Sequence, residues 1–253
     1  SGGAGRGPRR ARAVAGQRRG DLVDDAALKD ALESGKALRT ESRVEAGVVA
    51  DIFEFYGGLG GELKGESVPF APEVLSVTVR EPLGVVGAII PWNVPMLLMA
   101  LKVAPALVAG NAVVVKSAEE APLAVLRICE LMNRVLPPGV FNMVSGFGRE
   151  CGGPLVSHPL VRKVTFTGSV ETGKIIYKVA ADKLIPVTLE LGGKSPMIVF
   201  SDCDFEKTVS GALTSMRFTR QGQSCTAASR IYVERHFPPA AKESMDELVG
   251  NLV

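Results

Sequence analysis

Short apolar runs alternate with longer amphipathic segments along most of the chain from residue 84 onward. Runs rich in valine and isoleucine occupy residues 84–90, 111–116, 140–145, 162–167 and 184–190. Between these runs, the spacing of apolar residues predicts helices at about 96–109, 119–135, 148–157 and 169–181. Strands that alternate with helices of this length favour right-handed βαβ crossovers. The pattern therefore predicts an α/β fold with a doubly wound, mostly parallel sheet.

Two further helices are predicted upstream, at residues 22–38 and 43–64. A half-buried strand is predicted at 74–80, where apolar and polar residues alternate. Ligands of doubly wound sheets bind beyond the carboxyl ends of the strands. The turns that follow the predicted strands are therefore where we expect functional side chains.

The composition is that of a globular protein. The chain has 253 residues, of which 46% are hydrophobic and 22% charged, and this is enough to bury a sizeable core. The four cysteines are scattered, which argues against a disulfide framework and makes a reducing compartment, the cytoplasm, the expected location. No cysteine or histidine pair has the close spacing of a zinc site, so no metal is expected.

Positive charge is concentrated at the N-terminus. Residues 1–20 contain six arginines and no acid; without those six, 23 basic residues face 27 acidic ones, a net charge of −4 for the rest of the chain. The body therefore gives no reason to expect nucleic-acid binding. The head has the composition of a nucleic-acid arm or a transit peptide. Because it has a single serine and no amphipathic stripe, we interpret residues 1–25 as a disordered basic head.

The segment 88–115 is long enough to cross a membrane and contains one charged residue, Lys102. Prolines and asparagines interrupt this segment, at Pro91, Asn93, Pro95, Pro105 and Asn111. Residues of these types punctuate secondary structure, so a strand, a turn, a helix and a second strand are favoured over one spanning helix. No membrane association is expected.

Two turns contain residues suited to nucleotide binding. Lys116 ends one predicted strand and Glu119 follows it, an arrangement that suits a ribose or a phosphate, although Ser117 and Glu120 also have the spacing of a capping box. The segment 167–173 supplies glycines and a helix N-terminus, which attract phosphate. A capped helix start accounts for Ser117 and Glu120 in the first turn, and an ordinary glycine-containing turn accounts for 167–173. A structural interpretation therefore stays open for both turns.

Three other turns carry candidate chemistry. Asn93 follows a buried strand, where its amide could donate to an oxyanion or pack in a tight turn. Glu190 ends the last apolar run, as a solvated charge or a general base. Cys225 lies among small polar residues, whereas Cys129 lies in an apolar helical stretch. A thiol attacks as the thiolate, so the surroundings of Cys225 decide its reactivity.

The order of five motifs is more specific than any one of them. Along the chain come Pro91-Trp92-Asn93, Lys116-Ser117-Ala118-Glu119, Phe166-Thr167-Gly168-Ser169, Glu190-Leu191-Gly192-Gly193-Lys194-Ser195 and Gly222-Gln223-Ser224-Cys225. This order and spacing closely resemble the NAD(P)-dependent aldehyde dehydrogenase superfamily. The resemblance covers about residues 26–253 and implies an oxidoreductase that converts an aldehyde to a carboxylic acid.

The resemblance implies roles for four catalytic residues. Cys225 would add to the aldehyde carbonyl and form a thiohemiacetal, with Asn93 and the backbone amide of Cys225 holding the oxyanion. Hydride transfer to the nicotinamide would leave a thioester, and Glu190 would activate the water that hydrolyses it. Lys102 matches a lysine near the reaction centre, although it also suits the exposed face of a helix.

The same resemblance implies NAD as the cofactor. Lys116 and Glu119 match positions that hold the adenine ribose, and because the carboxylate would repel a 2′-phosphate, NADP is less favoured than NAD. Gly168 and Ser169 match the pyrophosphate turn, and Gly173 matches a close helix–strand contact. The other cofactor-binding residues that the resemblance implies are Pro91, Trp92, Ser117, Leu191 and Gly192.

The chain differs from the family in length, because family members are roughly twice as long. The expected domains are a Rossmann-like NAD-binding domain with N-terminal helices at 26–190 and an incomplete α/β catalytic domain at 191–253. The resemblance implies a homo-oligomeric family, and the segment that builds the oligomer is expected to lie outside these 253 residues. The chain is therefore expected to be a fragment or truncated member. The alternative to an active enzyme is a nucleotide-binding fragment without turnover.

Overall fold

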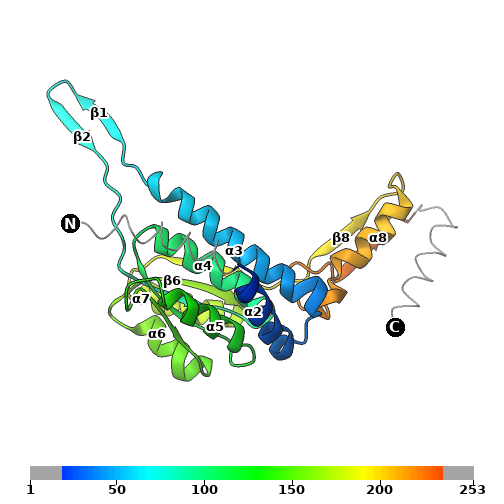
Figure 1. The fold of residues 1–253 in the computed structure, drawn as a ribbon. Helices are drawn as coiled ribbons and strands as arrows, with labels where there is room; N and C mark the ends of the chain where they lie inside the picture. The colour runs from blue at the N-terminus through cyan, green and yellow to red at the C-terminus, as the bar shows by residue number, and fades with distance from the viewer. Residues whose placement is uncertain (1–18, 236–253) are drawn as a thin grey trace. The chain divides into compact units, whose positions relative to one another are not determined.

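The computed structural model of this chain describes residues 19–235 and divides the chain into two compact units, Ser1–Glu190 and Leu191–Val253 (Figure 1). Most of the predicted basic head, residues 1–18, lies outside the described residues. Among the residues that are described, no helix is both long enough and apolar enough to cross a bilayer.

A five-stranded sheet forms the centre of the first unit, and its strand order is β5-β4-β3-β6-β7. The pairings of β3 with β4, of β3 with β6 and of β4 with β5 are parallel. The strands are β3 (Val85–Ile89), β4 (Ala112–Lys116), β5 (Phe141–Val144), β6 (Val161–Gly168) and β7 (Val187–Leu191). The predicted α/β fold with a doubly wound, mostly parallel sheet is confirmed.

Helices cover both faces of this sheet (Figure 1). The larger apolar cluster contains residues of α2 (Arg19–Ser34), α3 (Arg43–Gly58), α4 (Pro95–Val108) and α5 (Leu123–Asn133). The smaller cluster contains residues of α6 (Gly153–Ser157) and α7 (Val170–Asp182). The side chains of β3 contribute to the cores on both faces of the sheet. Val86 and Ala88 belong to the larger cluster and Ile89 to the smaller one. Successive side chains of a strand face opposite sides, so a continuous apolar run suits a strand covered on both faces.

A buried group of charges links the N-terminal helices. The ammonium of Lys36 lies 2.9 Å from the Asp30 carboxylate and also pairs with Glu45, and all three side chains are almost fully buried. The second oxygen of Glu45 accepts a hydrogen bond of 2.9 Å from the Leu97 amide, in the first turn of α4. Burial raises the pKa of Glu45 despite the nearby Lys36. One lysine thus joins α2 to α3, and one glutamate joins α3 to α4.

The helical boundaries differ from the predictions at the N-terminus. Arg19–Asp25, expected to belong to a disordered head, form the beginning of α2. The second predicted helix, 43–64, ends at Gly58 and is followed by a short 3-10 turn, η2 (Leu59–Gly61). A π-helical turn, η1 (Leu38–Ser42), precedes α3.

The predicted half-buried strand at 74–80 is wrong in its burial. Val74–Val77 form β2, which pairs antiparallel with β1 (Ser67–Ala71), a strand that was not predicted from the sequence. Leu75 is 86% exposed and Phe70 is 79% exposed. Alternation predicts a strand, but burial needs an element to cover its apolar face, and no described residue covers this two-stranded ribbon (Figure 1).

The described part of the second unit, residues 191–235, contains a short parallel pair of strands and one longer helix. Strand β8 (Pro196–Val199) pairs with β9 (Arg230–Val233), and α8 (Phe205–Ser215) lies between them in sequence. A second 3-10 turn, η4 (Phe218–Arg220), and then the segment that contains Cys225 connect α8 to β9.

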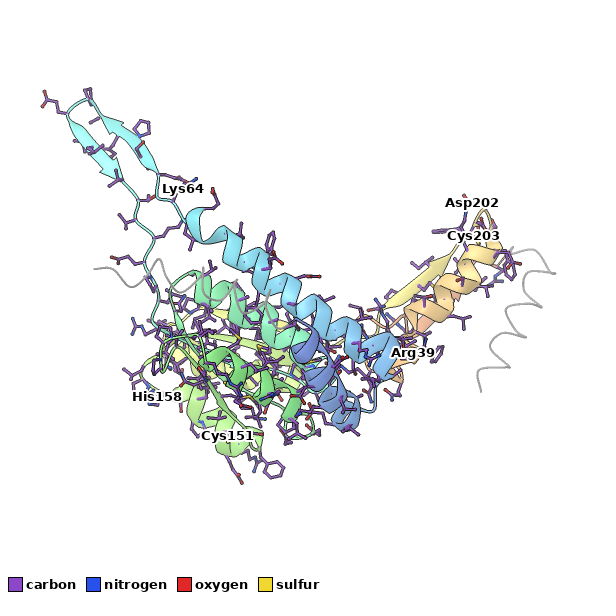
Figure 2. The ribbon with its side chains drawn as sticks, in the orientation of Figure 1. Arg39, Lys64, Cys151, His158, Asp202 and Cys203 are labelled. Atoms are coloured by element: carbon purple, nitrogen blue, oxygen red, sulfur yellow. The ribbon has the colours of Figure 1, made fainter. Side chains whose placement is uncertain are left out.

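Replacing Lys36 by methionine is expected to destabilise the chain by about 3 kcal/mol. Removing one partner of a buried ion pair leaves the remaining charge without compensation, and here Asp30 and Glu45 would both remain. Urea unfolding followed by circular dichroism measures the loss. The matched control is Lys64→Met, because Lys64 pairs with Glu62 in solvent (Figure 2) and its loss should cost less than about 1 kcal/mol. Equal losses in the two variants would contradict a stabilising role for the buried group.

Candidate functional site

A cavity of about 690 Å³ lies in the first unit at the carboxyl ends of the parallel strands. It is lined by residues from four successive strand-to-helix turns, those that follow β3, β4, β5 and β6. Six of the predicted cofactor-binding residues line it: Pro91, Trp92, Lys116, Glu119, Gly168 and Ser169. The turns that the sequence pointed to therefore meet at one edge of the sheet, as the parallel topology requires.

Lys116 and Glu119 form an ion pair at the wall of this cavity. The Lys116 ammonium donates to a carboxylate oxygen of Glu119 at 2.8 Å, and Lys116 is buried whereas Glu119 remains partly exposed. The hydrogen bond from Lys116 holds the pKa of the Glu119 carboxyl below its usual value. Glu119 is thus an ionised and solvent-accessible carboxylate, which can accept a hydrogen bond from a hydroxyl donor.

The turn after β6 presents a helix N-terminus to the cavity. Ser169 is the N-cap of α7, and its hydroxyl accepts from the Thr172 amide at 3.2 Å. The other amides of this first turn have no partner within the helix, which makes them an anion-binding site. A side chain at Gly168 would require the Phe166 ring to move, because a Cβ there would lie 2.5 Å from that ring.

Thr167 lies near the end of β6, directly before Gly168. Its hydroxyl makes no hydrogen bond within the described part of the protein. The residue is 8% exposed and lines the cavity. An unpaired buried hydroxyl is energetically unfavourable unless a ligand or water completes it. This is the kind of polar atom that a bound cofactor would satisfy.

Asn93 lies in the turn between β3 and α4. It is half-buried, and Pro95 begins α4 two residues later, where a proline suits the first helical turn. The amide of Leu97, one turn into the helix, is bound by Glu45. Because Glu45 belongs to α3, this hydrogen bond anchors the start of α4, and with it the turn that contains Asn93, to α3.

Lys102 is buried on α4, so the solvent-exposed position considered from the sequence is wrong. Its ammonium donates to the Thr165 hydroxyl at 3.2 Å. Burial lowers the pKa of Lys102 to about 8, and the negative charge of Glu190 acts in the opposite direction. Lys102 and Glu190, two of the four predicted catalytic residues, are therefore electrostatically coupled in the first unit.

Ser117 and Gly173 do not line the cavity. Ser117 is fully buried and donates to the Ser145 hydroxyl at 3.2 Å, which ties the end of β4 to the end of β5. It is not a helix cap, because α5 begins only at Leu123, and the first amides of α5 are accepted by the Glu33 carboxylate of α2. Gly173 lies buried in the first turn of α7, and its amide donates to the Ser169 carbonyl.

The remaining predicted residues belong to the second unit. Leu191 ends β7 and Gly192 follows it. Cys225 is an exposed free thiol between Ser224 and Thr226, whose hydroxyls lie 3.0 Å apart. The Ser224 hydroxyl also accepts from the Thr226 amide at 3.3 Å, so a tight local turn presents the thiol to solvent.

The sequence analysis missed one wall of the cavity. Arg149, Gly152 and Gly153 line it from a π-helical turn, η3 (Gly148–Gly152), and the start of α6. The run of glycines that begins at Gly146, directly after a predicted strand, was the available signal. A glycine-rich turn at a strand end permits close approach of a phosphate or sugar.

The fold and the cavity together define a doubly wound α/β protein with a ligand site at the carboxyl edge of its sheet. Comparison with known proteins identifies the family. Residues 14–253 match the family model of the aldehyde dehydrogenase family. The chain belongs to the aldehyde dehydrogenase family, which confirms the resemblance found in its motifs.

Relatives and solved structures agree with this assignment. The chain is 46% identical over 217 residues to phenylacetaldehyde dehydrogenase of Pseudomonas fluorescens, an alignment that covers 83% of this chain and 43% of the relative. A crystal structure of a family member from Burkholderia cenocepacia superposes with a TM-score of 0.88 at 41% identity, covering 98% of this chain and 51% of that one. The structure of PnpE in complex with nicotinamide adenine dinucleotide gives 0.91 at 36% identity, covering 99% of this chain and 50% of that one. The chain thus spans about half the length of the proteins it matches.

The Lys102 ammonium is expected to titrate at about pH 8, and Glu190→Gln should lower its pKa further. The carboxylate raises the pKa of Lys102, so removing its charge leaves the lowering by burial unopposed. NMR titration of isotope-labelled lysine measures the pKa of Lys102 in both proteins. The control is Glu171→Gln, on the exposed surface of α7.

The lowered pKa of Lys102 also affects stability. Between pH 8 and 10.5 the unfolded chain keeps the proton that the folded chain releases, so the contribution of Lys102 to stability rises with pH. A Lys102 pKa that is unchanged by Glu190→Gln would refute the coupling.

Proposed function

We propose that this protein is an oxidoreductase that oxidises an aldehyde to a carboxylic acid with NAD. The observation that carries the proposal is the cavity at the carboxyl ends of the parallel strands, which brings six candidate cofactor-binding residues together. Family membership supports it, as do relatives whose names describe the oxidation of phenylacetaldehyde and acetaldehyde.

NAD fits the chemistry of the residues that line the cavity. Lys116 and Glu119 supply a donor and an acceptor for the ribose hydroxyls, and the amides at the start of α7 suit a pyrophosphate. The unpaired hydroxyl of Thr167 is a further polar group that a dinucleotide could satisfy. The anionic Glu119 would oppose a 2′-phosphate, so NAD is preferred to NADP.

The protein's own residues would carry out the carbonyl chemistry. The Cys225 thiolate attacks the aldehyde carbon to give a thiohemiacetal, and the Asn93 side-chain amide donates to the oxyanion that forms. A bound nicotinamide supplies the acceptor for the hydride that this carbon loses. Glu190 then takes a proton from water, whose oxygen attacks the resulting thioester and displaces the Cys225 thiolate as the acid is released.

Lys102 would support the base. The positive charge of Lys102 interacts with the negative charge of Glu190, so Lys102 would help to hold the carboxylate in place. We therefore assign Lys102 as a positioning residue that acts through Glu190.

A second candidate function is nucleotide binding without turnover. The cavity lies within the first unit, whereas Cys225 lies in the second, and the chain spans about half the length of its relatives. Binding of the dinucleotide and attack by the thiol are therefore separable properties. Two experiments distinguish them.

The 253-residue chain is expected to bind NAD, and Lys116→Met should weaken this binding about tenfold. A hydrogen bond from a charged donor contributes about 1.5–3 kcal/mol, and Lys116 also positions Glu119. Isothermal titration calorimetry gives the dissociation constants, and Lys178→Met on the exposed side of α7 is the charge-matched control. If NAD does not bind to the folded chain, the proposed function is wrong, and so is its nucleotide-binding alternative.

The chain is expected to form NADH from NAD and an aldehyde, and Cys225→Ser should abolish this because a serine hydroxyl is far less nucleophilic. Absorbance of NADH with phenylacetaldehyde and acetaldehyde measures the reaction. The control is Cys203→Ser, at a half-buried thiol between β8 and α8 (Figure 2). Glu190→Gln should give a single burst of NADH and then stop, because the thioester is not hydrolysed. NAD binding without NADH from the unmodified chain would leave the second candidate.

A further inference from the structure

Lys183, the residue directly after α7, donates three hydrogen bonds to the backbone of one neighbouring segment. Its ammonium lies 2.9 Å from the carbonyl oxygen of Val156, 2.7 Å from that of His158 and 3.1 Å from that of Val161. An ammonium has three N–H donors, so all of them are used by these carbonyls. Among the described residues, no carboxylate forms an ion pair with Lys183. Its charge therefore acts on the backbone of the segment that joins α6 to β6.

Two of these carbonyls lie where regular secondary structure is interrupted. Val156 is in the last turn of α6, and the final carbonyls of a helix have no partner within it. The pairing of β6 with β3 shifts register directly after Val161, as in a β-bulge. Since α6 has only five residues, it depends on contacts with other elements for its position. Lys183 supplies such a contact.

The backbone at the end of α7 is fixed in an unfavourable conformation. Leu184, the next residue, has a φ of 52° and is 93% exposed, whereas glycine is the usual residue at this position of a helix end. The Ile185 amide donates to the Ala180 carbonyl at 3.1 Å, which closes the turn. A residue with a Cβ keeps a left-handed conformation only where the surrounding structure determines it. The three hydrogen bonds of Lys183 are part of what determines it here.

The segment that Lys183 binds forms a wall of the cavity. Val156 lines the cavity, is 2% exposed and packs in the smaller apolar cluster with Ile176 of α7. Ile176 and Val179 line the cavity from α7, and Lys183 follows Val179 by four residues, about one helical turn. One residue, Val156, thus lines the cavity while its carbonyl is bound from the end of α7.

We propose that Lys183 is a positioning residue, which holds α6 against the end of α7 and so sets the separation of two walls of the cavity. The inference rests on the proposed function, in which this cavity binds NAD. Lys183 does not line the cavity, so it acts on the ligand through Val156. Without its ammonium, the end of α6 loses its anchor to α7, and the contacts of α6 with the dinucleotide weaken although every lining side chain is unchanged.

Binding of NAD to the complete 253-residue chain tests this without requiring turnover. Isothermal titration calorimetry gives the dissociation constants, at a temperature where circular dichroism shows each variant to be folded. The central variant is Lys183→Met, and Lys178→Met is the matched control, because Lys178 is an exposed lysine of the same helix. Lys183→Gln keeps two N–H donors, which provides a milder variant if Lys183→Met does not fold.

Lys183→Met should weaken NAD binding about fivefold, Lys183→Gln by less, and Lys178→Met by less than about twofold, since a residue without ligand contact acts only through packing. A residue with a purely structural role would lower the stability of the chain and leave the affinity of the folded protein unchanged. The affinity measurement therefore separates positioning from stability.

Double variants identify the route of the effect. Val156→Ala should weaken NAD binding about threefold by itself and add less than about twofold to the loss in Lys183→Met, because both changes disturb the same wall. Lys116→Met lies on a different turn of the cavity, so its loss should multiply with that of Lys183→Met.

The outcomes separate the inference from the proposed function. If NAD binds and the folded Lys183 variants keep the unmodified affinity, or lose no more than Lys178→Met, the inference is wrong. It is also wrong if the losses in Lys183→Met and Val156→Ala simply multiply. Each of these results leaves the NAD proposal intact. Failure of the folded, unmodified chain to bind NAD overturns the proposed function and this inference together.

Discussion

The parallel alignment of β3, β4, β5 and β6 is the constraint on which the site depends. Parallel strands in one sheet end at the same edge, so each turn that follows them contributes to the same region. The chain first runs outward from β3 to β4 and β5, and then returns across β3 to β6. The crossovers after β3 and β6 therefore lie on opposite faces, with α4 in one apolar cluster and α7 against the other. The cavity lies where the direction of the chain changes.

The N-terminal helices also position the site, beyond covering one face of the sheet. Glu33 of α2 accepts from the first amides of α5, at 2.5 Å from Leu123 and 3.0 Å from Ala124. Glu45 of α3 accepts from Leu97 in the first turn of α4. These two helices begin directly after the turns that contain Lys116 and Asn93. Because a carboxylate satisfies helix amides and opposes the positive end of the helix dipole, α2 and α3 fix where α4 and α5 begin.

The alternation of strands and helices could be predicted from the sequence because it depends on local patterns. The strand predicted at 84–90 corresponds to β3, Val85–Ile89, and the helix predicted at 96–109 corresponds to α4, Pro95–Val108. The start of α5 could not be predicted in this way, because its cap is Glu33, some ninety residues earlier in the chain. Local spacing favoured Ser117 instead, which the structure buries against Ser145. Features set by contacts between distant segments are those that local patterns miss.

Site residues show the same division. Lys116 and Glu119 stand three residues apart, so their pairing follows from local geometry, and both were identified from the sequence. The burial of Lys102, which lowers its pKa to about 8, depends on Thr165 and the sheet beneath it, and no pattern within α4 indicates it. Arg149 reaches the cavity because β5 pairs with β4, although the glycines that begin at Gly146 were a local signal for a functional turn there.

The ion pair between Lys116 and Glu119 also fixes the charge at one wall of the cavity. Lys116 keeps the pKa of Glu119 below its ordinary value, so the carboxylate is ionised throughout the neutral range. In the proposed complex, this charge attracts the hydroxyl groups of a ribose and repels a 2′-phosphate. The second ionisation of a phosphate monoester has a pKa of about 6, so the repulsion is largest above that pH, where the phosphate carries its full charge.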